Sequence, residues 1–216
     1  METIKKVVVI GPESTGKSTL CQRLAEHYNT LWVPEYAREY LEKNGTEYSY
    51  DNLLTIAKGQ IELEEKAIQQ LAISNQQSGV STDSNPDRIP APGKKNLITN
   101  TQPYPYSSTS GDGGLLFIDT DMYVMKVWTE FVFNKCHDWI LNRIAERNYD
   151  LYLLCNIDLP WVKDALREYP DKKIREKLFS LYKDLMVNQS VPWHIISGNY
   201  EERLETAIQA IDASFT

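Results

Sequence analysis

A loop bounded by two glycines, set between an apolar strand and a helix, constrains this chain more than any other stretch. Residues 11–18 read GPESTGKS and match the pattern G-x-x-x-x-G-K-[ST] of phosphate-binding loops. The apolar run VVVI at 7–10 precedes the loop, as expected of a buried parallel strand. The alternative, a chance glycine-rich turn, predicts neither this strand nor the helical pattern that follows. The sequence therefore predicts a nucleotide site at 11–18.

The loop also predicts how a nucleoside triphosphate is held. Gly11 and Gly16 can take backbone angles closed to other residues, so the loop amides can converge on phosphate oxygens. The helix beginning near Gly16 directs its positive dipole end at the same anion. Lys17 adds a full positive charge, and the Ser18 hydroxyl can ligate Mg²⁺. We therefore expect ATP and Mg²⁺ as cofactors. Nucleotide contacts are expected from Gly11, Glu13, Ser14, Thr15, Gly16, Lys17, Ser18 and Thr19.

Composition argues against several other classes of protein. The chain has 216 residues, 42% of them hydrophobic, which suffices for one α/β domain or two small ones. No apolar run approaches the roughly 20 residues of a membrane-spanning helix, and no signal peptide precedes the first strand. A net charge of −7 without a basic stripe argues against nucleic-acid binding. The three cysteines lack paired spacing and indicate buried free thiols. We expect a cytoplasmic protein; its oligomeric state is not indicated.

Strands and helices alternate along most of the chain. Apolar strands are predicted at 4–10, 30–33, 115–121, 151–157 and 193–197. Helices are predicted at 16–28, 35–44, 51–73, 122–148, 158–188 and 201–213. This alternation favours an α/β fold with a parallel sheet, helices on both faces and right-handed crossovers.

A polar stretch interrupts the alternation at 74–114. It is rich in serine, threonine, asparagine, glutamine, glycine and proline, and it holds few apolar residues. A structureless loop of this length is uncommon inside a compact domain. We therefore predict a disordered insertion in a single domain that spans residues 1–216.

Acidic residues follow two of the predicted strands, at the edge where open α/β sheets bind ligands. Asp119 ends an apolar strand, which is where an acid that holds Mg²⁺ is expected in a protein with a phosphate loop. The alternative is that Asp119 caps the helix that follows. Asp121 could cap that helix or touch the substrate. Glu35 follows the second strand and could accept a proton from an attacking hydroxyl or hold a ribose diol. Arg38, one turn later, could join the site or only form a surface ion pair with Glu35.

The charged segment 158–188 is predicted to form a lid. Arg167, and after it Arg175, could neutralise charge on a transferring phosphoryl group while the lid excludes water; a solvated helix is the alternative. Asn199, in the turn after the last strand, could pass beneath a purine base, and a simple turn explains it almost as well. Stacking on the ring of an acceptor is possible for Trp32, Tyr36 or Trp161.

Five blocks of the sequence resemble the ribosylnicotinamide kinase domain of NadR-type proteins. They are GPESTGKS at 11–18, EYARE at 35–39, IAKGQ at 56–60, FIDTD at 117–121 and PWVKD at 160–164. The resemblance implies a P-loop NTPase fold like that of nucleoside monophosphate kinases, with a five-stranded parallel sheet in the order 2-3-1-4-5. It also implies ATP-dependent phosphorylation of nicotinamide riboside to nicotinamide mononucleotide.

The chain departs from this family at several points. The family has a ring-stacking tryptophan directly before its glutamate, where this chain has Pro34, and a lid glycine where this chain has Ala165. The helix-turn-helix and adenylyltransferase domains of NadR proteins have no counterpart in the sequence, and the stretch 74–114 is unlike the family. Two other functions stay open: a kinase of another nucleoside-like acceptor, and a non-catalytic nucleotide-binding regulator.

Overall fold

The centre of the fold is a parallel sheet of five strands in the order β2-β3-β1-β4-β5. The computed structural model describes residues 3–78 and 114–215. The strands are β1 (Lys5–Ile10), β2 (Leu31–Val33), β3 (Leu115–Asp119), β4 (Leu151–Cys155) and β5 (Trp193–Ile196). Every neighbouring pair is parallel, with Val9 opposite Asp119 on one side of β1 and Leu153 on the other. The predicted fold class and strand order are confirmed.

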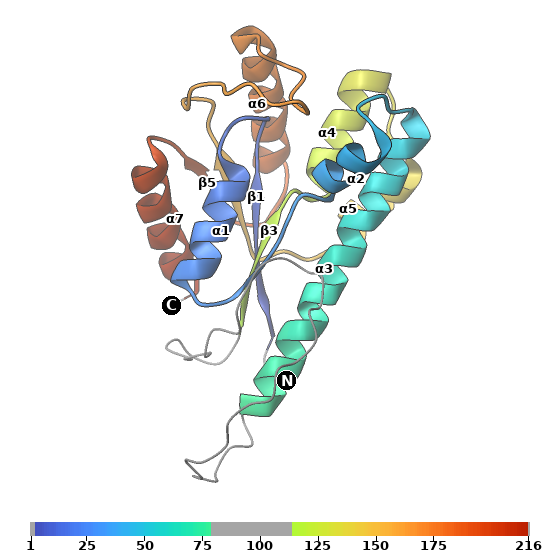
Figure 1. The fold of residues 1–216 in the computed structure, drawn as a ribbon. Helices are drawn as coiled ribbons and strands as arrows, with labels where there is room; N and C mark the ends of the chain where they lie inside the picture. Colours follow the sequence, from blue (N-terminus) through green and yellow to red (C-terminus); the bar gives the residue numbers. More distant parts are fainter. Residues whose placement is uncertain (1–2, 79–113, 216) are drawn as a thin grey trace.

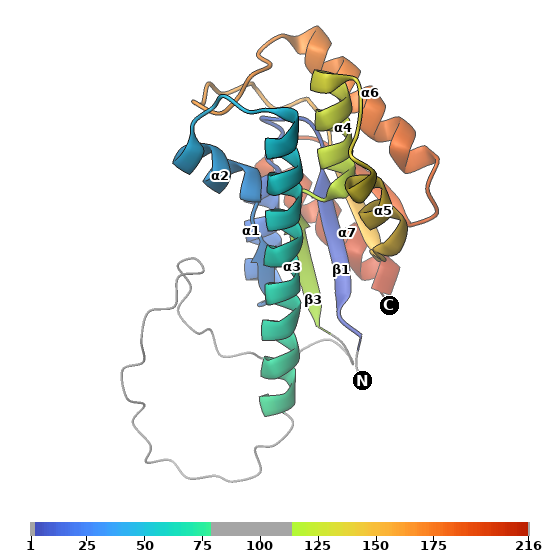
Figure 2. The same cartoon turned by 90° about the vertical axis from the view of Figure 1, so that its right-hand side faces the viewer.

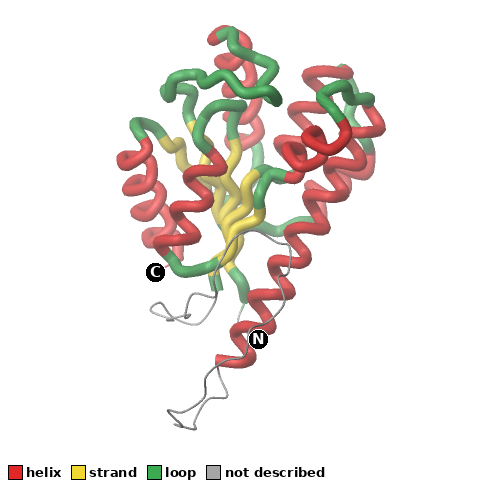
Figure 3. Tube along the Cα trace, in the orientation of Figure 1, coloured by secondary structure: helices red, strands yellow, loops and turns green. Residues whose placement is uncertain are grey.

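Helices cover both faces of this sheet, as Figures 1 and 3 show. They are α1 (Lys17–His27), α2 (Tyr36–Asn44), α3 (Tyr50–Ser78), α4 (Met122–Phe133), α5 (Asp138–Glu146), α6 (Lys172–Val187) and α7 (Tyr200–Phe215). Side chains of β1 alternate between the faces, since successive strand residues point to opposite sides. Val7 and Val9 pack with α1 and α7, whereas Val8 and Ile10 pack with α3, α4 and α6. The strand that leads into the phosphate loop is therefore buried on both faces.

A third apolar cluster lies beside the sheet and joins α2, α3, α4 and α5 around Leu53, Ile56 and Met125. Gly59 of α3 allows the close approach of α2, because a Cβ there would lie 2.1 Å from the ring of Tyr36. Figure 2 shows α3 running along the sheet and beyond its lower end. None of the described helices is both long and apolar enough to cross a membrane.

Two predicted helices differ clearly from the structure in their bounds. The segment 158–171 is irregular, and α6 begins only at Lys172, because Pro160 and Pro170 disfavour helix and Asp171 caps the new one. The helix α3 continues to Ser78, so residues 74–78 of the predicted insertion are helical. The remainder of that prediction, residues 79–113, lies outside the described residues. The cysteines are free, and Cys136 is only half-buried, not buried as predicted.

Candidate active site

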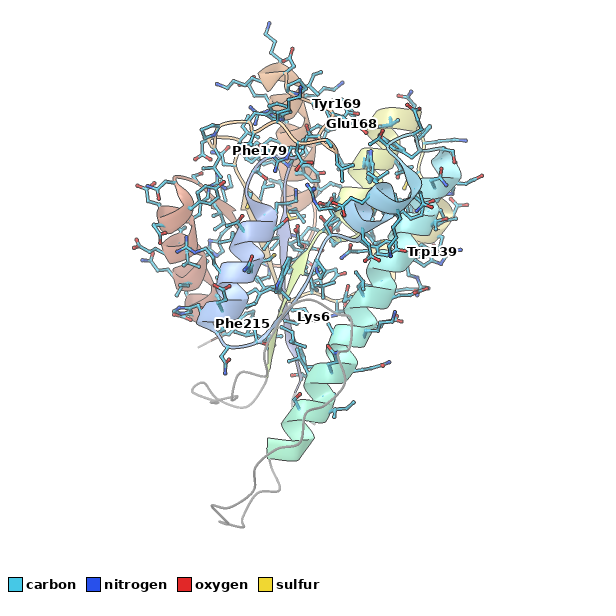
Figure 4. The ribbon with its side chains drawn as sticks, in the orientation of Figure 1. Lys6, Trp139, Glu168, Tyr169, Phe179 and Phe215 are labelled. Atoms are coloured by element: carbon cyan, nitrogen blue, oxygen red, sulfur yellow. The ribbon has the colours of Figure 1, made fainter. Side chains whose placement is uncertain are left out.

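A cavity of about 440 Å³ opens at the carboxyl end of the sheet. The phosphate loop and the start of α1, residues 11–19, form one wall. The other walls come from α2, α4, α6, the first residue of α7 and the segment 158–171. Glu168 and Tyr169 of that segment lie over this end of the molecule (Figure 4). The eight residues of 11–19 that were predicted to contact the nucleotide all line the cavity, whereas Asn199, the ninth, does not.

The two glycines of the phosphate loop are required by close contacts as well as by backbone angles. Gly11 has φ +139°, and a Cβ there would lie 2.8 Å from the carbonyl oxygen of Cys155. Gly16 has φ +79°, and its Cβ would lie 3.0 Å from Leu159. Residues with a side chain rarely adopt such angles, so glycine stands at the two positions where the backbone of the loop requires it.

Polar side chains tie the loop to itself. The Thr15 hydroxyl donates to the carbonyl of Pro12 at 2.7 Å, and the Lys17 ammonium donates to the same carbonyl at 3.2 Å. The Lys17 ammonium also lies close enough to Asp119 to lower the pKa of that carboxyl. Lys17 therefore sits between the loop and the acid at the end of β3.

Arg203 of α7 holds the loop to the segments that follow β4 and β5, and sequence reasoning missed it. Its side chain is 2% exposed and donates to the carbonyls of Thr15 at 3.1 Å, Asn156 at 3.0 Å and Gly198 at 2.8 Å. It also forms an ion pair with Asp158. The sequence does carry a signal for this role. Arg203 occupies an inward-facing position on the otherwise apolar face of α7, and an arginine is almost never fully buried unless it has a partner.

Asp119 lies at the end of β3, is fully buried and is not among the residues that line the cavity. Burial, with a smaller effect of the Glu35 charge, raises the pKa of Asp119 to about 6, against the opposing effects of Lys17 and a hydrogen bond with Ser18. Among the described residues its Oδ2 atom has no hydrogen-bond partner. An unpaired buried carboxylate oxygen next to a serine hydroxyl is a donor set that suits Mg²⁺, which prefers oxygen ligands.

Strain surrounds this acid. Thr120, the next residue, has φ +78°, which is a genuine outlier for a β-branched side chain and costs of order 1–3 kcal/mol. The turn ends β3 two residues earlier than predicted. It places the Thr120 hydroxyl 3.4 Å from Oδ1 of Asp119. Strain of this kind persists where the surrounding structure holds a functional group in place.

Asp121 serves as the cap of α4. Its Oδ1 accepts from the amides of Tyr123 at 3.0 Å and Val124 at 3.3 Å, and its Oδ2 accepts from the hydroxyl of Tyr152 at 2.9 Å. Burial raises the pKa of Asp121 to about 7. Both oxygens are used inside the protein and the residue is outside the cavity lining, so the geometry supports capping rather than substrate contact.

Glu35 and Arg38 line the cavity from α2, but they do not pair with each other. Arg38 forms ion pairs with Asp164 at 3.3 Å and with Glu42 at 3.8 Å. Glu35 is half-buried, and its side chain makes no capping hydrogen bond to α2. The alternative of a surface pair between Glu35 and Arg38 is therefore wrong, and Arg38 instead connects α2 to the segment 158–171.

The segment 158–171 covers the cavity, and its two predicted functional residues face different ways. Arg167 lines the cavity and donates to the carbonyl of Val162. The indole of Trp161 donates to Glu13 at 3.4 Å and lies outside the cavity lining, so the geometry does not favour stacking on an acceptor. Arg175 is buried on α6, also outside the lining.

The aromatic wall of the cavity differs from the predicted one. Trp32 packs on the α1 and α7 face of the sheet, and Tyr36 packs against α3, so neither reaches the cavity. Other aromatic residues line the cavity: Trp128 and Phe131 of α4, Tyr169, Tyr182 of α6 and Tyr200 of α7. The apolar residues of α4 have the helical spacing expected of core residues. The sequence therefore did not indicate that Trp128 and Phe131 line a cavity.

Asn199 also has a different role from the one predicted. Its side-chain oxygen accepts from the amides of Glu201 at 2.9 Å and Glu202 at 3.1 Å, so it caps α7 and supports the alternative of a simple turn. The neighbouring Tyr200 lines the cavity beside Gly16 and is 48% exposed. An exposed ring at this position is available to a nucleotide base.

Comparison with known proteins places the chain in a family. The family model for AAA domains matches residues 6–86 and 97–203. The chain belongs to this family. It is also homologous to the trifunctional NAD biosynthesis/regulator protein NadR of Salmonella typhimurium, with 24% identity over 213 residues, 96% of this chain and 42% of NadR. The chain thus spans less than half the length of this curated relative.

Solved structures share the fold. A crystal structure of NadR in complex with NR has a TM-score of 0.66 at 22% identity, covering 98% of this chain and 50% of NadR. NadR with NAD and AMP-PNP has a TM-score of 0.60 at 21% identity, covering 98% and 49%. Thymidylate kinase from Ehrlichia chaffeensis has a TM-score of 0.57 at 13% identity, covering 98% of each chain. The chain therefore shares its fold with NadR and with thymidylate kinase.

Proposed function

We propose that this chain is an ATP-dependent kinase that phosphorylates a small nucleoside-like acceptor, with nicotinamide riboside as the leading candidate. One observation carries the proposal: a single cavity joins the phosphate loop to a carboxylate, Glu35, and to an aromatic wall. A nucleotide-binding regulator needs the phosphate loop alone. A kinase also needs room for an acceptor and a group that orients its hydroxyl.

Two comparisons support this proposal. NadR is in complex with NR in one of its structures and with NAD and AMP-PNP in the other. Thymidylate kinase shares the fold over nearly its full length. A protein that has the phosphate loop and is related to NadR is most simply a phosphotransferase. We also propose that residues 1–216 form one catalytic domain.

The residues of the nucleotide wall would act by charge and position. Lys17 would neutralise the β- and γ-phosphates, and Arg167 would offset charge on the transferring group from the other side. Ser18 and Asp119 would hold Mg²⁺, which supplies positive charge at the phosphates when bound. The lone Oδ2 of Asp119 fits that use.

The acceptor would lie between α2 and α4. Glu35 would orient the acceptor hydroxyl and later take its proton. Trp128 and Phe131 of α4 would contact the acceptor ring, in place of the stacking tryptophan that Pro34 replaces. Arg38 would join α2 to the segment 158–171 through Asp164.

A panel of acceptors tests the proposal. ATP consumption by the purified protein should rise with nicotinamide riboside well above the rate without acceptor, and less with adenosine, uridine or thymidine. Higher turnover of another nucleoside would keep the kinase and change its acceptor. ATP binding without consumption for any acceptor would favour the regulator.

A further inference from the structure

The third residue of the phosphate loop, Glu13, directs its carboxylate at the segment 158–171. Its Oε2 accepts from the backbone amide of Glu168 at 2.9 Å. Its Oε1 accepts from the backbone amide of Tyr169 at 2.6 Å and from the indole of Trp161 at 3.4 Å. The next residue, Ser14, accepts from the backbone amide of Val162 at 3.0 Å. The loop therefore holds this segment near its beginning and near its end.

A carboxylate suits this task better than any other side chain of its size. The segment has no regular secondary structure, so its amides find no partners within a helix or sheet. A carboxylate accepts several hydrogen bonds and has no donor that would oppose them, and bonds to an ionised acceptor are about twice as strong as neutral ones. Facing the segment also turns the negative charge of Glu13 away from the phosphates that the loop would bind.

Arg167 lies between the two attachment points. It is bracketed by Val162, bound to Ser14, and Glu168, bound to Glu13, and its guanidinium donates to the carbonyl of Val162. The place of Arg167 in the cavity wall therefore depends on these bonds. The side chain of Val162 is 57% exposed, so side-chain packing adds little at that attachment point. Ion pairs of Asp158 with Arg203 and of Asp164 with Arg38 hold other parts of the segment.

We propose that Glu13 is a positioning residue, which holds the segment 158–171 and its Arg167 over the phosphate loop during phosphoryl transfer. The assignment rests on the proposed kinase function. Holding the segment closed keeps water from the γ-phosphate and favours the acceptor hydroxyl as nucleophile. Releasing it should slow transfer to the acceptor and let water compete.

The test is Glu13→Gln, which keeps the shape but presents an amide group to the backbone donors. With AMP-PNP and Mg²⁺ bound, hydrogen exchange at the amides of Glu168 and Tyr169 should become at least about tenfold faster. The kcat for transfer to the acceptor should fall about tenfold or more while the affinity for ATP stays within a few-fold. The fraction of ATP hydrolysed to free phosphate should rise. Glu13→Asp, which keeps the carboxylate, should restore part of the exchange protection.

The matched control is Glu26→Gln, an exposed glutamate of α1, which should match the wild type in every assay. Wild-type exchange at Glu168 and Tyr169 in Glu13→Gln would overturn the assignment, as would equal hydrolysis in the mutant and the wild type. The exchange measurement needs no acceptor. A wild-type protein that binds AMP-PNP but phosphorylates nothing would therefore refute the kinase function, while the exchange data would still test the contact.

Discussion

Asp119 and Glu64 are both buried carboxylates, but they lie at opposite ends of the sheet and differ in their partners. Glu64 of α3 is 1% exposed and binds the guanidinium of Arg147 at 2.7 Å, the hydroxyl of Tyr149 at 3.0 Å and the ammonium of Lys6 at 3.9 Å. Asp119 keeps one oxygen unpartnered among the described residues. Figure 4 shows Lys6 far from Glu168 and Tyr169, which mark the cavity end.

The difference separates stability from function. At the amino end of the sheet, opposite charges and a hydroxyl satisfy the buried acid, and this arrangement joins β1 to the start of β4. At the carboxyl end, an unpaired acid and the strained Thr120 lie beside the phosphate loop. Perturbed and unsatisfied groups of this kind cluster at functional sites, where they cost stability. Four substitutions test this comparison.

The largest effect is expected at the functional end, from Lys17→Ala. Removing the charge that faces the phosphates should lower phosphoryl transfer by about three decades, roughly 4 kcal/mol, and abolish stabilisation by ATP with Mg²⁺. The fold should remain, because Lys17 makes only one hydrogen bond to its own loop. Steady-state kinetics and thermal unfolding measure both; the exposed Lys183→Ala is the control. Intact nucleotide binding in Lys17→Ala would remove the residue from the site.

Glu64→Ala should have an effect of similar size, but on the free energy of unfolding and not on phosphoryl transfer. It leaves the charges of Arg147 and Lys6 without their buried partner, which should lower the free energy of unfolding by about 3–5 kcal/mol. Urea unfolding measures this loss. Glu65→Ala is the matched control, because Glu65 binds the same Arg147 at 2.9 Å but is 57% exposed, so less than about 1 kcal/mol is expected. Equal effects of the two variants would contradict the distinction.

Glu35→Gln should reduce turnover by about two decades, roughly 3 kcal/mol, with nearly unchanged ATP affinity. The change removes the acceptor-side charge and keeps its shape. Calorimetry measures the affinity for ATP and steady-state kinetics measure turnover, so together they distinguish a residue of the nucleotide wall from one of the acceptor wall. Glu39→Gln, at an exposed position of α2, is the control. Loss of ATP binding would move Glu35 to the nucleotide wall, and turnover near that of the wild type would leave it without a catalytic role.

The smallest expected effect on the free energy of unfolding is opposite in sign to that of Glu64→Ala. Asp119→Asn should raise the free energy of unfolding by about 1 kcal/mol at pH 8 in EDTA, while phosphoryl transfer is lost. A buried acid with a raised pKa binds its proton more tightly in the folded than in the unfolded chain, so the wild type loses stability as the pH rises from about 4 through about 6. The advantage of the variant should therefore disappear near pH 4. Destabilisation at pH 8 would show that Asp119 is satisfied.

Part of this molecule could be predicted from sequence because the signals are local. The phosphate loop needs consecutive residues with suitable backbone angles, and each central strand needs a short apolar run. Asp119 and Glu35 could be singled out because Asp119 ends one strand and Glu35 lies just after another. The helix expected over 158–171 failed because two prolines outweighed the charge pattern that suggested it.

The sequence alone thus determined the nucleotide half of the site, since residues 11–19 are adjacent in the chain and carry their own geometry. Only the tertiary structure decided the rest. It brought Arg203 to Thr15 across 188 positions and Glu13 to Tyr169 across 156, and it turned Trp128 toward the cavity and Trp32 into the core. Those choices depend on which buried groups find partners once the layers pack, and no short stretch of sequence contains that information.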